Sequence, residues 1–156
     1  MAFHIAPLSG PEDVADFVVL LDAYVASLGV DLAYQGWPEE RASLPGPYAP
    51  PLGAALLARA AGGAPLGCVA IRPLKPGIAE MKRLFCAPAA RGQGLGRALA
   101  LAALDAARAC GYRELWLDTL PEMQAAQSLY RALGFAPRTA YGKAVLPGTL
   151  FFSRAV

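Results

Sequence analysis

The segment from Arg91 to Arg97 constrains this chain more than any other part of the sequence. It reads Arg-Gly-Gln-Gly-Leu-Gly-Arg, and an alanine- and leucine-rich run follows it to Cys110. Glycine lets a backbone approach an anion closely, and the first N–H groups of a helix lack intrahelical partners. The helix dipole adds about half a positive charge at that end. The pattern fits two interpretations, a cradle for a pyrophosphate and a plain glycine-rich turn before a surface helix.

The spacing of the glycines excludes two familiar phosphate motifs. A P-loop requires Lys followed by Ser or Thr after its last glycine, whereas Gly96 is followed by Arg97 and Ala98. The dinucleotide fingerprint requires a third glycine three positions after the second, and arginine occupies that position. What remains is the pattern Arg-x-x-Gly-x-Gly, formed by Arg91, Gly94 and Gly96.

Length and composition limit the class of protein. A chain of 156 residues predicts one domain over residues 1–156. The net charge of +2, without any block of like charge, argues against nucleic-acid binding. Apolar runs stay short of about 18 residues and the first ten residues lack a secretion signal, so we expect a cytoplasmic protein outside the membrane. A single histidine, His4, and three cysteines without metal-ligand spacing predict no metal site.

Apolar periodicity predicts an α/β chain in which a mixed sheet is flanked by helices. The segment 31–51 is rich in proline and aromatic residues and is expected to be an irregular but ordered binding loop. A capping box at 119–122 predicts the start of the last helix. The expected helices are 11–28, 95–110 and 119–133, and the expected strands are 3–6, 54–61, 65–74, 78–86, 113–118, 137–141 and 148–154.

Three separated motifs resemble those of the GNAT superfamily of N-acetyltransferases. They are the loop 91–97, the run Glu80 to Pro88 that leads into it, and Ala126-Gln127-Ser128-Leu129-Tyr130 followed by Gly134-Phe135. The predicted element order also matches, so the resemblance covers nearly the whole chain. It implies the GNAT fold, which is a mixed, mostly antiparallel central sheet flanked by helices in the order β-α-(α)-β-β-β-α-β-α-β-β, where the helix in parentheses is optional. It also implies an enzyme that uses acetyl-CoA without a metal. Dimers are common in this family, so a homodimer is a further possibility.

The resemblance also implies where the coenzyme lies. The pantetheine arm is expected along the backbone of the fourth strand, which splays away from the fifth and supplies a backbone N–H to the oxyanion. The pyrophosphate is expected on the glycine loop. Arg97 fits either a phosphate ligand or a solvated arginine at the helix start. The implied coenzyme residues are Leu84, Phe85, Cys86, Arg91, Gly92, Gln93, Gly94, Leu95, Gly96 and Arg97.

Tyr130 matches a family tyrosine near the coenzyme sulfur, and the resemblance implies a general acid there. A phenol with an ordinary pKa of about 10 can protonate a thiolate in a water-poor cleft. The alternative is an amphipathic tyrosine that caps the core. Asp118, at the end of the fifth strand, is interpreted as a cap or turn residue. The chain departs from the family at Met123, where many members carry an asparagine.

Glu80 is the carboxylate predicted to act as a base through water, because some family members place a base on this strand. Strand alternation predicts that it shares a face with Leu84 and Cys86. The alternative is a structural partner for Lys82 or Arg83.

The acceptor side depends on the segment that overhangs the cleft. Gln35, Trp37 and Tyr48 are predicted wall residues, and Tyr141 is another, although such aromatic residues can equally pin a loop to the domain. Further segments resemble a bacterial subgroup whose substrates are largely unassigned. The resulting prediction is acetyl transfer from acetyl-CoA to a primary amine of a small molecule, amino acid or peptide by direct attack in a ternary complex. A covalent intermediate on Cys86 is a variant, and a non-catalytic acyl-CoA sensor is the alternative.

Overall fold

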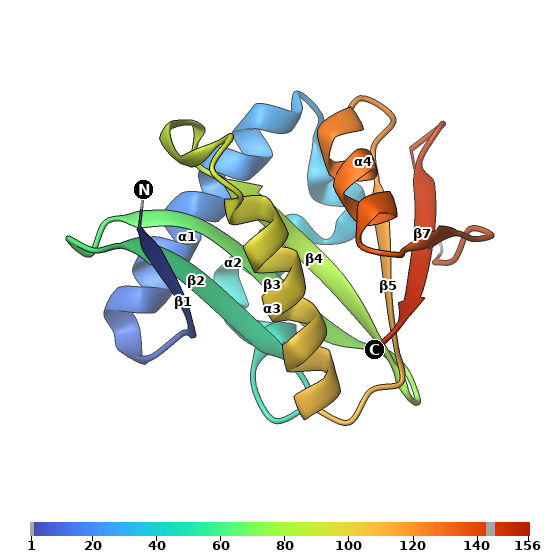
Figure 1. Ribbon diagram of the computed structural model, residues 1–156, viewed down its shortest axis with the longest axis horizontal. Coiled ribbons are helices and arrows are strands. Elements are labelled where there is room, and N and C mark those ends of the chain that lie inside the picture. Colours follow the sequence, from blue (N-terminus) through green and yellow to red (C-terminus); the bar gives the residue numbers. More distant parts are fainter. Residues whose placement is uncertain (1, 143–145) are drawn as a thin grey trace.

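The computed structural model describes residues 2–142 and 146–156 and places a seven-stranded sheet between two pairs of helices (Figure 1). The strand order is β1-β2-β3-β4-β5-β7-β6. The strands are β1 (Phe3–Pro7), β2 (Ala54–Ala60), β3 (Pro65–Lys75), β4 (Ile78–Cys86), β5 (Glu114–Thr119), β6 (Ala136–Pro137) and β7 (Leu150–Ala155). The helices are α1 (Gly10–Leu28), α2 (Trp37–Ser43), α3 (Leu95–Ala109) and α4 (Gln124–Ala132), with short 3-10 turns η1 (Leu32–Gln35), η2 (Gly46–Tyr48) and η3 (Pro88–Ala90).

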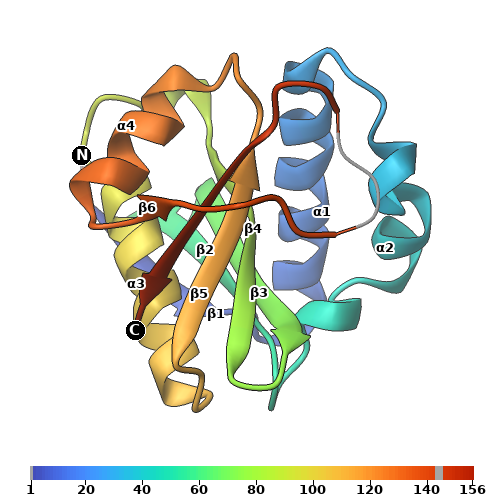
Figure 2. The same cartoon turned by 90° about the vertical axis from the view of Figure 1, so that its right-hand side faces the viewer.

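Helices α1 and α2 cover one face of the sheet, and α3 and α4 cover the other (Figure 2). Each face has its own apolar core. Phe17 and Leu21 of α1 are fully buried in the first core, and Leu99 and Ala103 of α3 are fully buried in the second. No helix in the described ranges is both long enough and apolar enough to span a membrane.

Helix α1 has the ends that its sequence predicts. The Ser9 backbone N–H donates to Asp13 Oδ2 at 2.8 Å, and Pro11 occupies the first turn, where its missing N–H costs nothing. Gly29 ends the helix with φ of 67°, in the left-handed region that glycine adopts without strain.

The sheet is mixed, because β4 and β5 are parallel whereas the other neighbouring strands are antiparallel. This confirms the expected mixed, mostly antiparallel architecture. Pairing between β4 and β5 is confined to Ile78–Glu80 against Glu114–Trp116. Beyond Glu80 the two strands separate, and β4 keeps only its partner β3 among the described strands. One edge of the β4 backbone is therefore left available at the centre of the molecule.

A bulge at Arg83 changes which face of β4 each side chain occupies. Phe85 pairs with Cys68 but Lys82 pairs with Ala70, so β4 carries one extra residue, and Arg83 has a φ of 64°. Leu84 and Cys86 consequently pack on the α3 side, together with Ala79 and Met81. The side chains on the opposite face of β4 are those of Glu80, Lys82 and Phe85. The prediction that Glu80 shares a face with Leu84 and Cys86 is therefore wrong.

Three further expectations about secondary structure need correction. The segment 31–51 is not irregular throughout, because it contains two 3-10 turns and α2, which is the optional second helix of the expected element order, and Glu40 of α2 pairs with Arg83. The capping box at 119–122 is absent, since Thr119 belongs to β5 and α4 begins only at Gln124. The expected strand 137–141 shortens to β6, because the chain then crosses in front of β5 (Figure 2).

The turn before α4 is held without a cap. Gln127 is buried, and its Nε2 donates to the carbonyl oxygens of Leu120 and Pro121 at 3.0 and 3.1 Å. A side chain of α4 thereby supplies hydrogen bonds to two carbonyl groups of the preceding turn. This arrangement fixes Met123 and the start of α4 beside the open edge of β4.

Candidate active site

A cavity of about 480 Å³ lies between the end of β4, the glycine loop and the first turn of α4. Its lining includes most of the predicted coenzyme residues, namely Leu84, Phe85, Cys86, Arg91, Gly92, Gly94, Leu95 and Gly96. Gln93 and Arg97 are exposed and do not line it, and Gln93 Nε2 instead donates to the Ala89 carbonyl oxygen at 3.3 Å. We call this space the donor cavity.

The glycine loop has a backbone that only glycine adopts easily. Gly92 and Gly94 have φ of 77° and 79°, and Gly94 is the residue that caps α3. Arg91 Nε donates to the Cys86 carbonyl oxygen at 3.1 Å, and its guanidinium lies 5.9 Å from the centre of the Phe85 ring. The start of α3 and the arginine together present positive charge to one end of the donor cavity.

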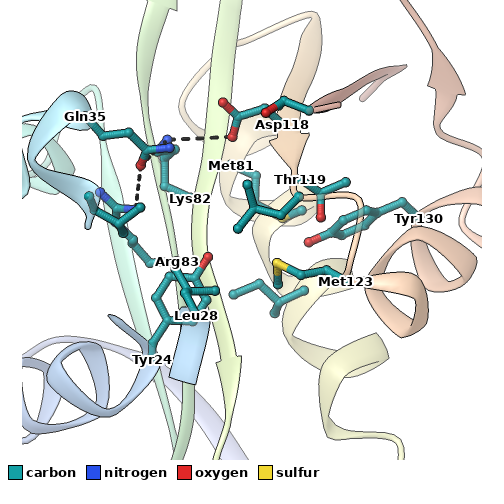
Figure 3. A pocket seen from close by; sticks show the side chains of 14 residues that line it. Tyr24, Leu28, Gln35, Met81, Lys82, Arg83, Asp118, Thr119, Met123 and Tyr130 are labelled. Carbon is teal, nitrogen blue, oxygen red and sulfur yellow. Dashed lines mark hydrogen bonds and ion pairs between the residues drawn. The ribbon is translucent and has the colours of Figure 1, made fainter. Parts of the chain in front are cut away.

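A second, smaller cavity of about 40 Å³ lies where β4 and β5 separate (Figure 3). We call it the inner pocket. Both cavities are lined by Tyr24, Leu28, Leu84 and Met123, so the two spaces adjoin. The room in the inner pocket suits the reacting end of a small molecule rather than a bulky group.

Tyr130 reaches the inner pocket from α4, and its hydroxyl points into it (Figure 3). The ring is held edge-on against Phe135 and tilted against Phe152, with centroids 5.8 and 6.3 Å away. Burial raises the pKa of the phenol above its usual value, so the group keeps its proton at neutral pH. Thr119 lines the same pocket, and within 2–142 and 146–156 its buried Oγ1 has no hydrogen-bond partner.

The other side of the inner pocket is charged. Lys82 Nζ lies 3.8 Å from Asp118 Oδ1 and 3.4 Å from Gln35 Oε1, and all three residues line the pocket (Figure 3). Burial lowers the pKa of Lys82, with Asp118 and Glu80 acting against that effect. Asp118 therefore lines the pocket, which the cap or turn interpretation did not anticipate.

Arg83 is held by a buried pairing that links β4 to α2. Its Nε and Nη2 donate to the two carboxylate oxygens of Glu40 at 3.0 and 2.9 Å, and its Nη1 donates to Gln35 Oε1 at 2.9 Å. Burial disfavours the charge and is the largest single effect, but the hydrogen bonds to Glu40, the Glu40 charge and the nearby Tyr48 and Tyr24 together outweigh it and raise the pKa of Arg83. The pair also compensates for the left-handed backbone at Arg83, which costs about 1–3 kcal/mol at a residue with a side chain.

Glu80 lies behind the inner pocket rather than in its lining. Its Oε1 accepts bonds from Arg72 Nε and Nη2 at 2.9 and 2.8 Å, and its Oε2 accepts the Tyr141 hydroxyl at 2.8 Å. Tyr141 packs on Trp116 and Phe151 with ring centroids 5.3 and 5.1 Å away. Burial, reinforced by the Glu80 charge, raises the pKa of Tyr141. These contacts agree with a structural role for Glu80, and the catalytic role stays a prediction.

Of the four predicted acceptor residues, the structure brings Gln35 alone into the lining of the inner pocket. Trp37 is buried beneath Arg83, whose guanidinium lies 5.4 Å from the ring centre. Tyr48 is fully buried, 6.4 Å from the Phe17 ring centre, and borders a separate cavity of about 490 Å³. Tyr141 covers Glu80, as described above.

The cysteines are placed poorly for nucleophilic or metal chemistry. Burial raises the pKa of the Cys86 thiol, which reduces the thiolate needed for an acetyl-enzyme. Cys68 is fully buried, and its Sγ donates to the Arg83 carbonyl oxygen at 3.4 Å. In the described part of the chain, no three His, Cys, Asp or Glu residues are grouped so that they could hold a metal.

The sequence did not predict that α1 lines the donor cavity, nor that Lys82 of β4 and Asp118 of β5 both line the inner pocket. Tyr24, Ser27 and Leu28 line the donor cavity from the last turns of α1. In the sequence, Tyr24 and Leu28 look like ordinary members of an apolar stripe, so periodicity carries no signal for them. Lys82 and Asp118 could be recognised as a pair only once the separation of β4 and β5 was known.

Comparison with known sequences gives consistent matches. The profile of the acetyltransferase (GNAT) family matches residues 21–135. An uncharacterized N-acetyltransferase of Schizosaccharomyces pombe is 36% identical over 148 residues, which cover 94% of this chain and 91% of that protein. The IAA acetyltransferase of Azospirillum brasilense is 41% identical over 81 residues, covering 51% of this chain and 53% of that protein.

Solved structures share the whole architecture. A proposed acyl-CoA N-acyltransferase of Klebsiella pneumoniae has a TM-score of 0.77 at 28% identity, with 98% of this chain and 97% of that chain covered. The PaiA N-acetyltransferase of Thermoplasma acidophilum, solved in complex with coenzyme A, has a TM-score of 0.76 at 18% identity, with 100% of both chains covered. The second likeness concerns the fold alone.

Proposed function

Since this chain belongs to the acetyltransferase (GNAT) family, we propose that it transfers an acetyl group from acetyl-CoA to a primary amine of a small molecule, amino acid or peptide. The observation that carries the proposal is the contact between the donor cavity and the inner pocket at Leu84 and Met123. A thioester that reaches this junction lies beside Tyr130 and faces the charged residues of the inner pocket. The name of the Schizosaccharomyces pombe relative supports the same reaction.

The donor cavity offers acetyl-CoA two kinds of binding group. The glycine loop and the start of α3 suit the pyrophosphate, because their N–H groups point outward and Arg91 adds a charge. The edge of β4 beyond Glu80, which has no β5 partner in the described ranges, suits the amide groups of the pantetheine arm. Binding through backbone groups explains why apolar side chains such as Leu84 and Phe85 line a coenzyme site.

The reaction proceeds by direct attack. The amine nitrogen, having lost a proton, forms a bond to the thioester carbonyl carbon, and a backbone N–H of β4 stabilises the oxyanion. The carbon–sulfur bond then breaks, the electron pair stays on sulfur, and the Tyr130 hydroxyl gives its proton to the thiolate. The attacking nitrogen, which still carries one proton too many for an amide, gives that proton back to the Tyr130 oxygen. Asp118 is the carboxylate that lines the inner pocket, so it accepts the hydrogen bond of the incoming ammonium. The proton that the ammonium loses before the attack passes through water to Glu80, which is the candidate base.

The proposal is tested by thiol release from acetyl-CoA against amino acids, small amines, peptide N-termini and aminoglycosides, with mass spectrometry of the product. Acceptor-dependent release of one thiol for each acetylated amine is the expected result. Coenzyme binding alone does not separate an enzyme from a sensor. A chain that binds acetyl-CoA tightly and acetylates none of these amines contradicts the proposal and supports the sensor. Acetyl-enzyme formed on Cys86 before acceptor is added would contradict direct attack.

A further inference from the structure

We propose that the inner pocket selects acceptors that carry a carboxylate beside the reacting amine, as α-amino acids do, with Lys82 binding the carboxylate and Asp118 the ammonium. This inference rests on the proposed function and narrows its acceptor class. Its basis is the set of charges at the separation of β4 and β5.

Two of the three ion pairs around the pocket have charged atoms within hydrogen-bonding distance. Arg83 and Glu40 form a two-pronged pair at 3.0 and 2.9 Å, and Arg72 and Glu80 pair at 2.9 and 2.8 Å. Lys82 and Asp118 differ, because their charged atoms are 3.8 Å apart, which is too far for a hydrogen bond. Both members of this loosely paired set line the inner pocket, and the further charged residue of the lining, Arg83, is already held by Glu40.

Lys82 has bonding capacity to spare. An ammonium group has three N–H donors, and the contact of Lys82 with Gln35 Oε1 is long at 3.4 Å. Gln35 Oε1 also accepts the shorter bond from Arg83 at 2.9 Å. The Lys82 side chain is 7% exposed, and burial lowers its pKa although Asp118 and Glu80 act against that effect, so its charged form is only partly compensated. An anion in the pocket would supply it.

The charges of an α-amino acid match this arrangement. Its carboxylate and ammonium are attached to one carbon, so a single small ligand can meet Lys82 and Asp118 from inside one pocket. The limited room of about 40 Å³ favours such a compact pair of groups. An acceptor with a second ammonium would instead bring like charge toward Lys82 and Arg83, which is unfavourable. Peptide N-termini lack the neighbouring carboxylate and would bring no anion to Lys82.

The first test uses the wild-type protein with saturating acetyl-CoA and matched sets of acceptors. Each set contains an α-amino acid, its carboxamide and the corresponding decarboxylated amine. The expected kcat/KM is about 10- to 100-fold higher for the amino acid, which is the range for a hydrogen bond to a charged group. Equal values within a set, or a preference for the amide or amine, would overturn the inference while leaving the acetyltransferase intact. Absence of thiol release with every acceptor would instead contradict the proposed function.

The second test removes the cation. In Lys82→Met the ratio of kcat/KM for amino acid over amide is expected to fall toward one, and Lys82→Arg is expected to retain part of it. Lys75→Met is the matched control, since Lys75 lies outside both cavities over Trp116. A fall in kcat/KM by the same factor for all three acceptors would place Lys82 in the chemistry or in the fold and overturn the assignment.

A binding measurement keeps the test independent of turnover and of a folding defect. Calorimetric titration of the wild-type protein loaded with coenzyme A should show a higher affinity for the amino acid than for its carboxamide. Weaker binding of the amino acid than of the amide would contradict the role of Lys82, whatever the variants do. Thermal melting and acetyl-CoA affinity identify any variant that fails to fold.

Discussion

At the scale of single residues, the chemistry proposed for Tyr130 requires a phenol that keeps its proton until the thiolate leaves. Burial between Phe135 and Phe152 raises its pKa, so the residue is protonated across the neutral range. The sequence motif located this residue in the chain. The rings that bury it are brought to α4 by the end of that helix and by β7, which only the fold reveals.

Replacing Tyr130 by phenylalanine distinguishes a role as general acid from a role in packing. In Tyr130→Phe the ring and its contacts remain and the proton donor is lost, so we expect kcat to fall by about 10²-fold or more while the affinity for acetyl-CoA changes little. Steady-state kinetics and calorimetric titration of the coenzyme check this. Unchanged turnover would contradict the acid assignment.

The two carboxylates near the pocket are expected to respond differently. Glu80→Gln leaves the Arg72 charge without its partner and weakens the bond from Tyr141, so we expect the free energy of unfolding to fall by about 1–2 kcal/mol, discounted because Arg72 is one-third exposed. Asp118→Asn removes the anion in the pocket and should mainly raise KM for the acceptor.

Urea unfolding and steady-state kinetics of these two variants separate stability from chemistry. If Glu80→Gln keeps its stability but loses kcat with every acceptor, Glu80 is the base and the structural interpretation is wrong.

At the scale of elements, local pattern and global arrangement contribute differently. The apolar stripe of α1, its proline start and its glycine end are readable over a few residues, and the structure confirms them. The bulge at Arg83 is not readable, because Lys82 and Arg83 look like any polar residues of a strand. It depends on the pairing of Arg83 with Glu40, forty-three positions away in the chain.

Two neighbouring glycines of the loop are expected to behave in opposite ways. A Cβ at Gly96 would lie 3.6 Å from Leu129 Cδ2 and 3.7 Å from Cys86 Sγ, in ordinary contact but inside the lining of the donor cavity. Gly96→Ala should therefore weaken acetyl-CoA binding while stabilising α3 by about 0.5–1 kcal/mol. Gly94 has a φ of 79°, so Gly94→Ala should lower stability by about 1–2 kcal/mol.

Thermal or urea unfolding and coenzyme titration of the two glycine variants measure both quantities. Coenzyme affinity of Gly96→Ala equal to that of the wild type would show that the first turn of α3 is not part of the coenzyme site.

At the scale of the whole molecule, the buried charges couple stability to pH. Burial lowers the pKa of Lys82 in the folded protein below its ordinary value of 10.5. Between the lowered pKa and 10.5 the unfolded chain therefore binds more protons than the folded one, and the free energy of unfolding rises with pH. The buried tyrosines act in the opposite direction above about pH 10, since their raised pKa values let the unfolded chain ionise first.

The difference between wild type and Lys82→Met isolates the lysine, because the tyrosines contribute equally to both. We expect the wild type to gain stability relative to the variant as pH rises from 7 toward 10, measured by urea unfolding at each pH. A constant difference over this range would mean that the lysine retains its ordinary pKa in the folded protein.

The sequence by itself determined the element order, the glycine loop and the position of Tyr130. These depend on backbone requirements and apolar periods that a few adjacent residues encode. The tertiary structure alone decided that β4 and β5 separate after Glu80, that a bulge turns Glu80 away from Leu84, and that Lys82 faces Asp118 across the gap. The physical reason is that the interactions of a buried charge depend on which partner the fold brings close to it. Arg83 and Glu80 find close partners, whereas Lys82 and Asp118 are left open to the pocket.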